Sequence, residues 1–345
     1  MIQGITSMKE RNHSLDLMRV VLSLYVIALH SLQHFGIEDP VVSALVHILL
    51  VSSNGLFYML SGYFNLEKEF RNSEDIKEYY KSRFIGILFP FLAFVFVWTI
   101  WDYIHVFGGF DLGKILSLYY RSIVDTSAYG HMWFMYPLFG LLLSTPFLSK
   151  MLHSMDKKEL KILWYIAIGY NVVLYYLCRN HDIGFSVLCW ILEGWTVLYF
   201  AGYYYRHVIA EESILKWILL GIVGYIFTVL GNNGLLPFFK TFEGATNTQP
   251  MFIFYCVGCF MFCDRVIRIK DGILGNVLTF LGKHTYMIYL YHPRGIEYVI
   301  RKLTITENGI GSGLLIVFGS YLVSLLLAFV TDLCLKPVQK LLKKI

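Results

Sequence analysis

FIGILFPFLAFVFVWTIW (84–101) and GLLIVFGSYLVSLLLAFV (313–330) decide the fold class of this chain. Neither stretch contains an Asp, Glu, Lys or Arg over its 18 residues. An α-helix rises about 1.5 Å per residue, so either stretch can cross most of a hydrocarbon core about 30 Å thick. Both stretches therefore predict membrane-spanning helices.

The composition of the whole chain agrees with this interpretation. Of the 345 residues, 57% are hydrophobic and 15% are charged, against about 25% charged in an ordinary soluble domain. The expected fold class is all-α, with one polytopic membrane domain over residues 1–345 and no room for a second, soluble domain. Apolar runs predict about ten spans, at residues 15–34, 41–63, 84–104, 132–150, 161–178, 184–205, 214–231, 250–264, 273–292 and 311–332.

The distribution of Lys and Arg predicts how these spans are oriented. With a cytoplasmic N-terminus, 20 of the 29 basic residues fall in cytoplasmic segments, 7 in outer segments and 2 within spans. Both termini are then cytoplasmic, and so is the charged loop at 65–83, whose sequence predicts an interfacial helix. The net charge of +5 is assigned to these cytoplasmic segments and not to binding of nucleic acid.

Polar residues on one face of the first span are the main candidates for function. At 100° per residue, one stripe of the predicted helix collects Asp16, Arg19, Ser23, His30, Gln33 and His34. Ionisable groups inside a span cost at least about 2.5–3.5 kcal/mol each, which favours a functional role. Arg19 and His30 are eleven residues apart, about 16 Å along the axis. The stripe therefore predicts one wall of a path through the protein.

The same residues also have structural interpretations. His30 could be a packed, hydrogen-bonded histidine. Arg19 could extend to lipid headgroups or pair with Asp16 at i, i+3. The alignment of all six side chains favours function over these alternatives.

Other polar residues in or near spans are weaker candidates. Glu193 could line the same path or pair with a basic group. Lys283 and His284 lie close to a bend expected after Gly282, where they could serve function or form structural pairs. Ser61 could hydrogen-bond across a helix interface.

Two further histidines lie where interfaces are expected. His131 and Trp133 suit an aromatic anchor at the outer interface. His292, at the outer end of its span, is expected to be solvated.

The cysteines give no sign of a metal centre. Cys256, Cys259 and Cys263 have helical spacing with no histidine arranged beside them. They are interpreted as small packing residues, and no metal site is expected.

Five segments together resemble acyltransferase family 3, the integral-membrane acyltransferases of bacterial surface polysaccharides. The first carries an Arg followed eleven residues later by a His, as in the family's opening helix. The segments occur in the family's order: SLDLMRVVLSLYVIALHS (14–31), NGLFYMLSGYF (54–64), YKSRFIGILFPFL (80–92), HMWFMYPLFGLLL (131–143) and LGKHTYMIYLYHP (281–293). One departure concerns the basic entry to the third span, where the family often has two arginines at i, i+3. Here the residue three positions after Arg83 is Gly86 and not a second arginine, and Lys81 lies nearby.

The resemblance implies a membrane O-acyltransferase of the bacterial plasma membrane. The donor would be cytoplasmic acyl-CoA, usually acetyl-CoA, and the acceptor a hydroxyl of an extracytoplasmic glycan or lipid-linked sugar. No permanently bound cofactor is implied, and membrane lipids surround the domain. Arg19, Arg83 and Lys81 would bind the CoA phosphates. His30 would act as the catalytic base, with Asp16 holding Arg19.

Two other classes of function remain open from the sequence. A transporter or flippase of glycans or small metabolites could use the same polar stripe, although no matching Gly/Pro-broken halves are evident. A non-catalytic partner of a polysaccharide synthase would make the alignment of Arg19 and His30 accidental. The sequence does not indicate an oligomeric state.

Overall fold

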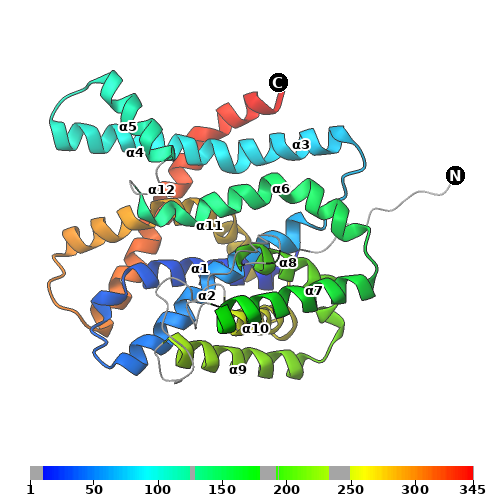
Figure 1. Cartoon of the computed structure of the whole chain (residues 1–345). Coiled ribbons are helices and arrows are strands. Elements are labelled where there is room, and N and C mark those ends of the chain that lie inside the picture. Colours follow the sequence, from blue (N-terminus) through cyan, green and yellow to red (C-terminus); the bar gives the residue numbers. More distant parts are fainter. Residues whose placement is uncertain (1–10, 125–128, 179–191, 193, 233–248, 345) are drawn as a thin grey trace.

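The computed structural model describes residues 11–124, 129–178, 192, 194–232 and 249–344, and over these residues the chain is helical without a strand. The all-α prediction is thus confirmed. Most long helices lie side by side along one direction (Figure 1). They are α1 (His13–His30), α2 (Pro40–Asn65), α3 (Ser73–Arg83), α4 (Phe89–Phe107), α5 (Leu112–Val124), α6 (Met135–His153), α7 (Lys157–Val172), α8 (Gly194–His207), α9 (Ile214–Asn232), α10 (Pro250–Met261), α11 (Ile273–Leu303) and α12 (Ile310–Lys344).

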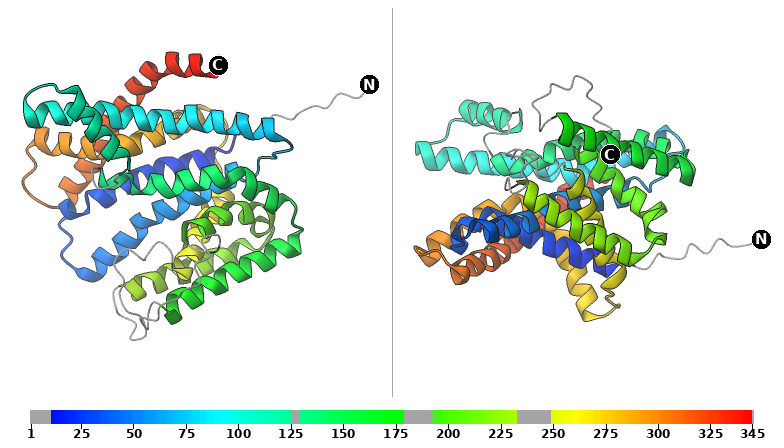
Figure 2. Two further views of the ribbon diagram at one scale, coloured as in Figure 1. Left: turned by 45° about the horizontal axis from the view of Figure 1, so that its top comes forward. Right: turned by 60° about the horizontal axis from the view of Figure 1, so that its bottom comes forward.

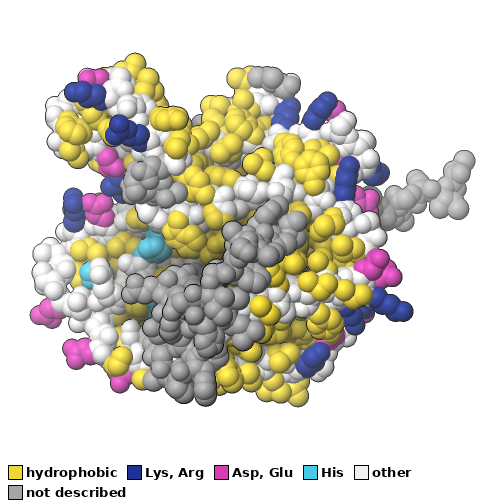
Figure 3. Space-filling model, in the orientation of Figure 1, with side chains coloured by type: hydrophobic (Ala, Val, Ile, Leu, Met, Phe, Trp, Pro, Cys, Tyr) yellow, Lys and Arg dark blue, Asp and Glu magenta, His cyan; other side chains and the backbone are white. Residues whose placement is uncertain are grey.

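Six helical segments among the described residues are long and apolar enough to cross a membrane. They are His13–His30, Pro40–Asn65, Ser73–Phe107, Gly130–His153, Ile214–Gly231 and Ile310–Lys344. The other predicted spans fall on α7, α8, α10 and α11, none of which is both long and apolar enough within the described residues, and the predicted span at 184–205 begins outside them. A broad hydrophobic surface lies across the face seen in Figure 3, with charged side chains mostly at its two edges. This distribution suits a protein embedded in a bilayer.

The first helix ends earlier than the sequence analysis expected. Its N-terminus is capped by the Asn12 side chain, which accepts hydrogen bonds from the backbone of Ser14 and Leu15. Its last residue is His30, and a short 3-10 helix, η1 (Leu32–Phe35), follows before the chain turns at Gly36 with a φ of 64°. Gln33 and His34 therefore leave the predicted stripe, because their backbone no longer continues the α-helical rotation.

The charged segment at 65–83 contains a helix, as the sequence predicted. This helix, α3, continues through the π-helical turn η2 (Phe84–Leu88) into α4. Pro90 explains the wider turn, since it has no N–H for the carbonyl four residues earlier and its ring would crowd that carbonyl. Arg83 therefore lies on the same continuous helical segment, Ser73–Phe107, as the apolar stretch at 84–101.

The connection between the predicted spans at 84–104 and 132–150 contains a helix, α5, that could not be identified from the sequence. Helix α5 folds back along α4, and the two form a hairpin that extends from the bundle (Figure 1). The Tyr119 hydroxyl donates to the carbonyl of Leu92, and the Tyr119 and Phe96 rings meet edge to face at 5.2 Å. This hairpin leads into the 3-10 turn η3 (Gly130–Phe134), which carries His131.

Helix α1 lies at the centre of the fold, between α2 on one side and the α11–α12 pair on the other (Figure 2). Close contact of α2 with α8 depends on two glycines. A Cβ added at Gly62 would lie 1.7 Å from the Tyr199 carbonyl oxygen, and one at Gly202 would lie 2.1 Å from that of Met59. Only glycine permits this approach of the two backbones, which fixes α2 beside α8, and α2 supplies lining residues such as Phe57 and Ser61 to the cavity described below.

Candidate functional site

Three histidines from distant parts of the sequence meet beside the C-terminal end of α1. His30 ends α1, His131 lies in η3 and His292 lies within α11. The His292 ring lies 4.7 Å from that of His30 and 5.3 Å from that of His131, centroid to centroid. We refer to these three residues as the histidine trio.

Backbone carbonyls orient two of the three rings. The Nδ1 of His30 lies 2.8 Å from the Val26 carbonyl, and the Nδ1 of His292 lies 2.5 Å from the Tyr289 carbonyl. A carbonyl oxygen only accepts, so each Nδ1 carries the proton and each neutral ring keeps its lone pair on Nε2. The orienting partner of His30 is thus a carbonyl of its own helix.

The trio combines two histidines whose Nε2 atoms are buried with one exposed histidine. His292 has an exposed fraction of 0%, and the Nε2 atoms of His131 and His292 are buried without a hydrogen-bond partner within the described part of the chain. His30 remains exposed. A substrate hydroxyl can therefore reach His30, whereas the other two rings form the wall behind it.

Two tyrosines hold η3 in position against the trio. The Tyr289 hydroxyl donates to the backbone carbonyl of His131, and the Tyr58 hydroxyl donates to that of Phe134 at 2.9 Å. The Phe134 and Tyr289 rings lie 5.7 Å apart. Helices α2 and α11 therefore fix the position of His131, although it lies in a short 3-10 turn.

A cavity of about 550 Å³ lies next to this position, and none of the three histidines is among its lining residues. One end is cationic, with Arg19, Lys68, Arg83 and Lys283 among its lining residues. The apolar part of the lining includes Phe57, Ile87, Pro90, Phe134, Met135, Leu138 and Tyr289. Phe134 belongs to η3 and Tyr289 supports η3, and the Tyr289 ring lies 5.7 Å from that of His292. Tyr289 thus contacts both the histidine trio and this cavity with a positively charged end, which we refer to as the donor cavity.

Arg19 is held in the donor cavity by a buried carboxylate. Its guanidinium lies 2.7 Å from Asp16, whose exposed fraction is 1%, and 4.7 Å above the Phe64 ring. Asp16 also accepts from Arg11 and Thr279. One carboxylate thus balances two arginines, so net positive charge remains at this position.

The other cations reach the donor cavity from different elements. The Arg83 guanidinium lies 5.1 Å from the Tyr79 ring, and its Nε is buried without a hydrogen-bond partner within the described residues. Lys68 lies 5.3 Å from the same ring. Partial removal from water, and then repulsion by Arg83, lower the pKa of Lys68 from its ordinary value. A further anion in the cavity would offset that repulsion.

The remaining predicted site residues divide into those at the donor cavity and those outside it. Ser61 and Lys283 line it. His284 faces α12, where its Nε2 lies 3.2 Å from Asp332, another lining residue. Helix α11 is continuous here, so the bend expected after Gly282 is absent. Lys81 is exposed and donates to the Lys343 carbonyl at 3.0 Å instead of lining the cavity.

Three further candidates have other surroundings. Ser23 is buried and donates to the Val20 carbonyl. Trp133 is 37% exposed, and its ring lies 5.6 Å from that of Trp195. Glu193 lies outside the described residues.

Several residues of this site were not identified as site residues from the sequence. His292 was expected to be solvated but is fully buried, because α11 continues to Leu303 and does not end at the predicted outer boundary. The final His of the LGKHTYMIYLYHP segment was the available signal. Lys68 and Asp332 line the donor cavity without any local pattern that marks them.

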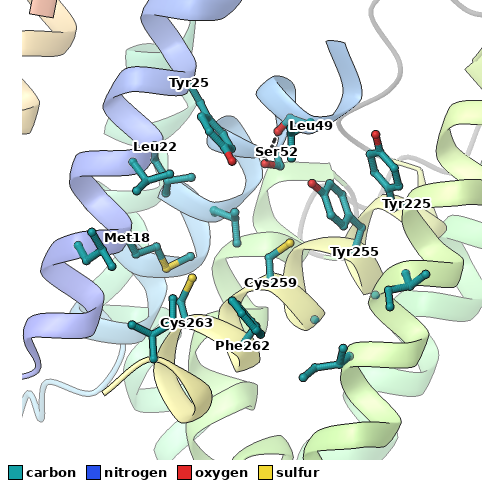
Figure 4. A pocket seen from close by; sticks show the side chains of 18 residues that line it. Met18, Leu22, Tyr25, Leu49, Ser52, Tyr225, Tyr255, Cys259, Phe262 and Cys263 are labelled. Carbon is teal, nitrogen blue, oxygen red and sulfur yellow. Dashed lines mark hydrogen bonds between the residues drawn. The ribbon is translucent and has the colours of Figure 1, made fainter. Parts of the chain in front are cut away.

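A second cavity, of about 560 Å³, lies on the far side of α1, between α2, α9 and α10 (Figure 4). Its lining is mostly apolar and includes Met18, Leu22, Cys259 and Cys263, with the hydroxyls of Tyr25 and Tyr255 pointing inward. Cys259 and Cys263 therefore line a cavity instead of serving only as packing residues.

Comparison with known proteins gives one match. A family model described as an acyltransferase domain, of the acyltransferase 3 type, matches residues 12–332. This range contains the donor cavity cations and all three histidines of the trio. No curated protein and no solved structure matches the chain.

Proposed function

The chain belongs to acyltransferase family 3, and from this premise we propose that it moves an acyl group, in particular acetyl, from cytoplasmic acyl-CoA to a hydroxyl of an extracytoplasmic or lipid-linked glycan. Family membership favours an acyl-transfer enzyme over the transporter that the polar stripe also suggested. The observation that carries the proposal is the donor cavity, whose lining combines four cationic side chains with Tyr289, a residue in ring contact with His292 of the trio.

The shape of acyl-CoA suits this arrangement. Its phosphates would lie among Arg19, Lys68, Arg83 and Lys283, where charge-assisted hydrogen bonds are stronger than neutral ones. The pantetheine arm would follow the apolar lining past Phe134 and Tyr289. The thioester would then arrive beside His30, about 16 Å along α1 from Arg19.

The reaction needs one base in a fixed orientation. The His30 Nε2 lone pair accepts the proton of the acceptor hydroxyl while its oxygen attacks the thioester carbonyl. The C–S bond then breaks and the CoA thiolate leaves. The imidazolium returns the proton to that sulfur, so the products are an O-acyl ester and CoA thiol. The Val26 carbonyl keeps Nδ1 protonated throughout and so preserves the reactive tautomer.

The test is acyl transfer by purified protein reconstituted in lipid nanodiscs. With radiolabelled acetyl-CoA and a panel of glycans, wild-type protein should form labelled glycan and release CoA thiol, and His30→Gln should do neither while still binding acetyl-CoA. Equal thiol release by both proteins would contradict the proposed role of His30. A stable label on denatured wild-type protein, absent from His30→Gln, would instead indicate an acyl-imidazole intermediate in place of direct attack.

A further inference from the structure

A third and smaller cavity lies at the end of the bundle away from the donor cations, between α4, α5 and the start of η3. It has a volume of about 210 Å³ and is lined in part by Asp102, Tyr103, Phe107, Ser122 and Tyr129. Its lining thus combines a carboxylate, hydroxyls and aromatic rings. We refer to it as the hairpin pocket.

The carboxylate of the hairpin pocket is held rigidly. Arg294 donates to both Asp102 oxygens, and the Tyr129 hydroxyl donates to Oδ2 at 3.1 Å. The Arg294 guanidinium lies 4.6 Å from the centre of the Trp98 ring and is also bonded to Glu297. A carboxylate has about four acceptor sites, and these contacts occupy three of them, so Asp102, which is 37% exposed, can accept one further hydroxyl in a fixed position.

Aromatic rings form the other side of the hairpin pocket. The Tyr103 and Phe107 rings are one helical turn apart with centroids 4.8 Å from each other. Phe107 is 66% exposed and Tyr103 is buried. A sugar ring presents an apolar C–H face and hydroxyls at its edge, and this pocket offers aromatic surface for the one and a fixed acceptor for the other.

The hairpin pocket is connected to the histidine trio through Tyr129. The Tyr129 ring lies 6.5 Å from that of His131, and Arg294 follows His292 by two residues on α11. One aromatic ring therefore separates the pocket from the trio, which places a ligand in the pocket beside the reacting hydroxyl and not at it.

We infer that the hairpin pocket binds a sugar unit of the acceptor next to the unit that is acylated. This inference rests on the proposed function and sharpens it, because such a subsite requires an acceptor of at least two linked sugars. A structural role alone would explain the Asp102–Arg294 ion pair. It would not explain why that pair opens into a pocket beside an exposed phenylalanine.

The experiment compares acceptors of different length. Wild-type protein in nanodiscs receives acetyl-CoA and a series of methyl glycosides with their matched di- and tetrasaccharides, and labelled glycan and free CoA thiol are both measured. Oligosaccharides should be used with a KM about tenfold or more below that of the matched monosaccharides.

Two variants separate recognition from folding. Phe107→Ala should raise the KM for oligosaccharides severalfold and leave that for acetyl-CoA unchanged. Phe110→Ala is the matched control, because Phe110 is equally exposed, at 67%, but does not line the hairpin pocket. Asp102→Asn should raise the oligosaccharide KM about ten- to a hundredfold, since it removes a charged acceptor.

The outcomes distinguish this inference from the proposed function. Transfer that is equal for mono- and oligosaccharides, and unchanged in Phe107→Ala, would overturn the subsite and leave the acyltransferase proposal intact. Release of CoA thiol with no transfer to any glycan would overturn both the glycan acceptor and the subsite.

Discussion

The cationic end of the donor cavity and the histidine trio are built in different ways. Four cations reach the cavity from α1, α11 and the segment around α3, and three of these, Arg19, Lys68 and Arg83, lie against aromatic rings. The histidines are instead fixed singly, with the Nδ1 atoms of His30 and His292 each bonded to a backbone carbonyl. Distributed charge suits binding of a flexible polyanion, because loss of one cation leaves the others. Proton transfer at the Nε2 of His30 depends on that one atom, so no neighbouring group can replace it.

The proposed function places the cationic end of the donor cavity toward the cytoplasm and the histidine trio toward the outer side. Residues near the two should therefore be labelled from opposite sides of the membrane, an all-or-none effect. In a cysteine-free background, a cysteine at Arg71, in the loop before α3, should resist an impermeant thiol reagent in intact cells. A cysteine at Glu307, between α11 and α12, should react with it. Permeabilised cells serve as the control for both sites. Labelling of position 71 from outside would reverse the proposed topology.

The largest catalytic effect is expected at His30. His30→Ala removes the proposed base, so transfer should fall by about 10²–10⁴-fold. The dissociation constant for acetyl-CoA, measured by calorimetry on the same protein, should remain near that of wild type. His34→Ala is the control, since His34 lies in η1 beyond the end of the helix. Normal transfer by His30→Ala would exclude the proposed mechanism without affecting the family assignment.

A smaller effect, confined to donor binding, is expected at Arg19. A charged hydrogen bond contributes about 1.5–3 kcal/mol, so Arg19→Ala should weaken acetyl-CoA binding roughly ten- to a hundredfold. The rate at saturating donor should change much less. A collapse of that rate with unchanged affinity would show that the two ends do not divide binding and chemistry as proposed.

Arg83 and Lys81 allow a sharper test of which side chains belong to the cationic end. Arg83→Ala should weaken donor binding about tenfold, because its guanidinium lines the donor cavity. Lys81→Ala should have almost no effect, because Lys81 instead contacts the C-terminal part of α12. Similar losses in the two variants would return Lys81 to the donor site.

The smallest effect is a pH dependence at Lys68. Its pKa is lowered by partial removal from water and by Arg83, so it loses its proton at a lower pH than a free lysine. Donor binding needs the protonated form, so affinity should decline as the pH rises through this lowered pKa, by a few-fold because three other cations remain. Lys68→Arg should abolish the decline, since a guanidinium stays charged. An identical alkaline decline in both proteins would assign it to another group.

Much of the architecture could be predicted because it depends on local properties of the chain. Apolar runs predicted membrane helices, and the segments Ser73–Phe107 and Ile310–Lys344 contain the two stretches that first indicated them. The 100° step of a helix placed Arg19 and His30 on one face, and Asp16 at i, i+3 forms the expected ion pair. Backbone geometry alone determines these relations.

The rest depended on which helices become neighbours. No local pattern showed that His292 would be buried against His30, that Lys68 and Asp332 would line the donor cavity, or that Arg294 would clamp Asp102 from 192 residues away. The end of α1 at His30 likewise removed Gln33 and His34 from the stripe. The spacing of residues in the sequence determines which side of a helix each side chain faces. Close packing between helices determines which directions meet, and that depends on contacts such as Gly62 against Tyr199 whose partners are far apart in the chain.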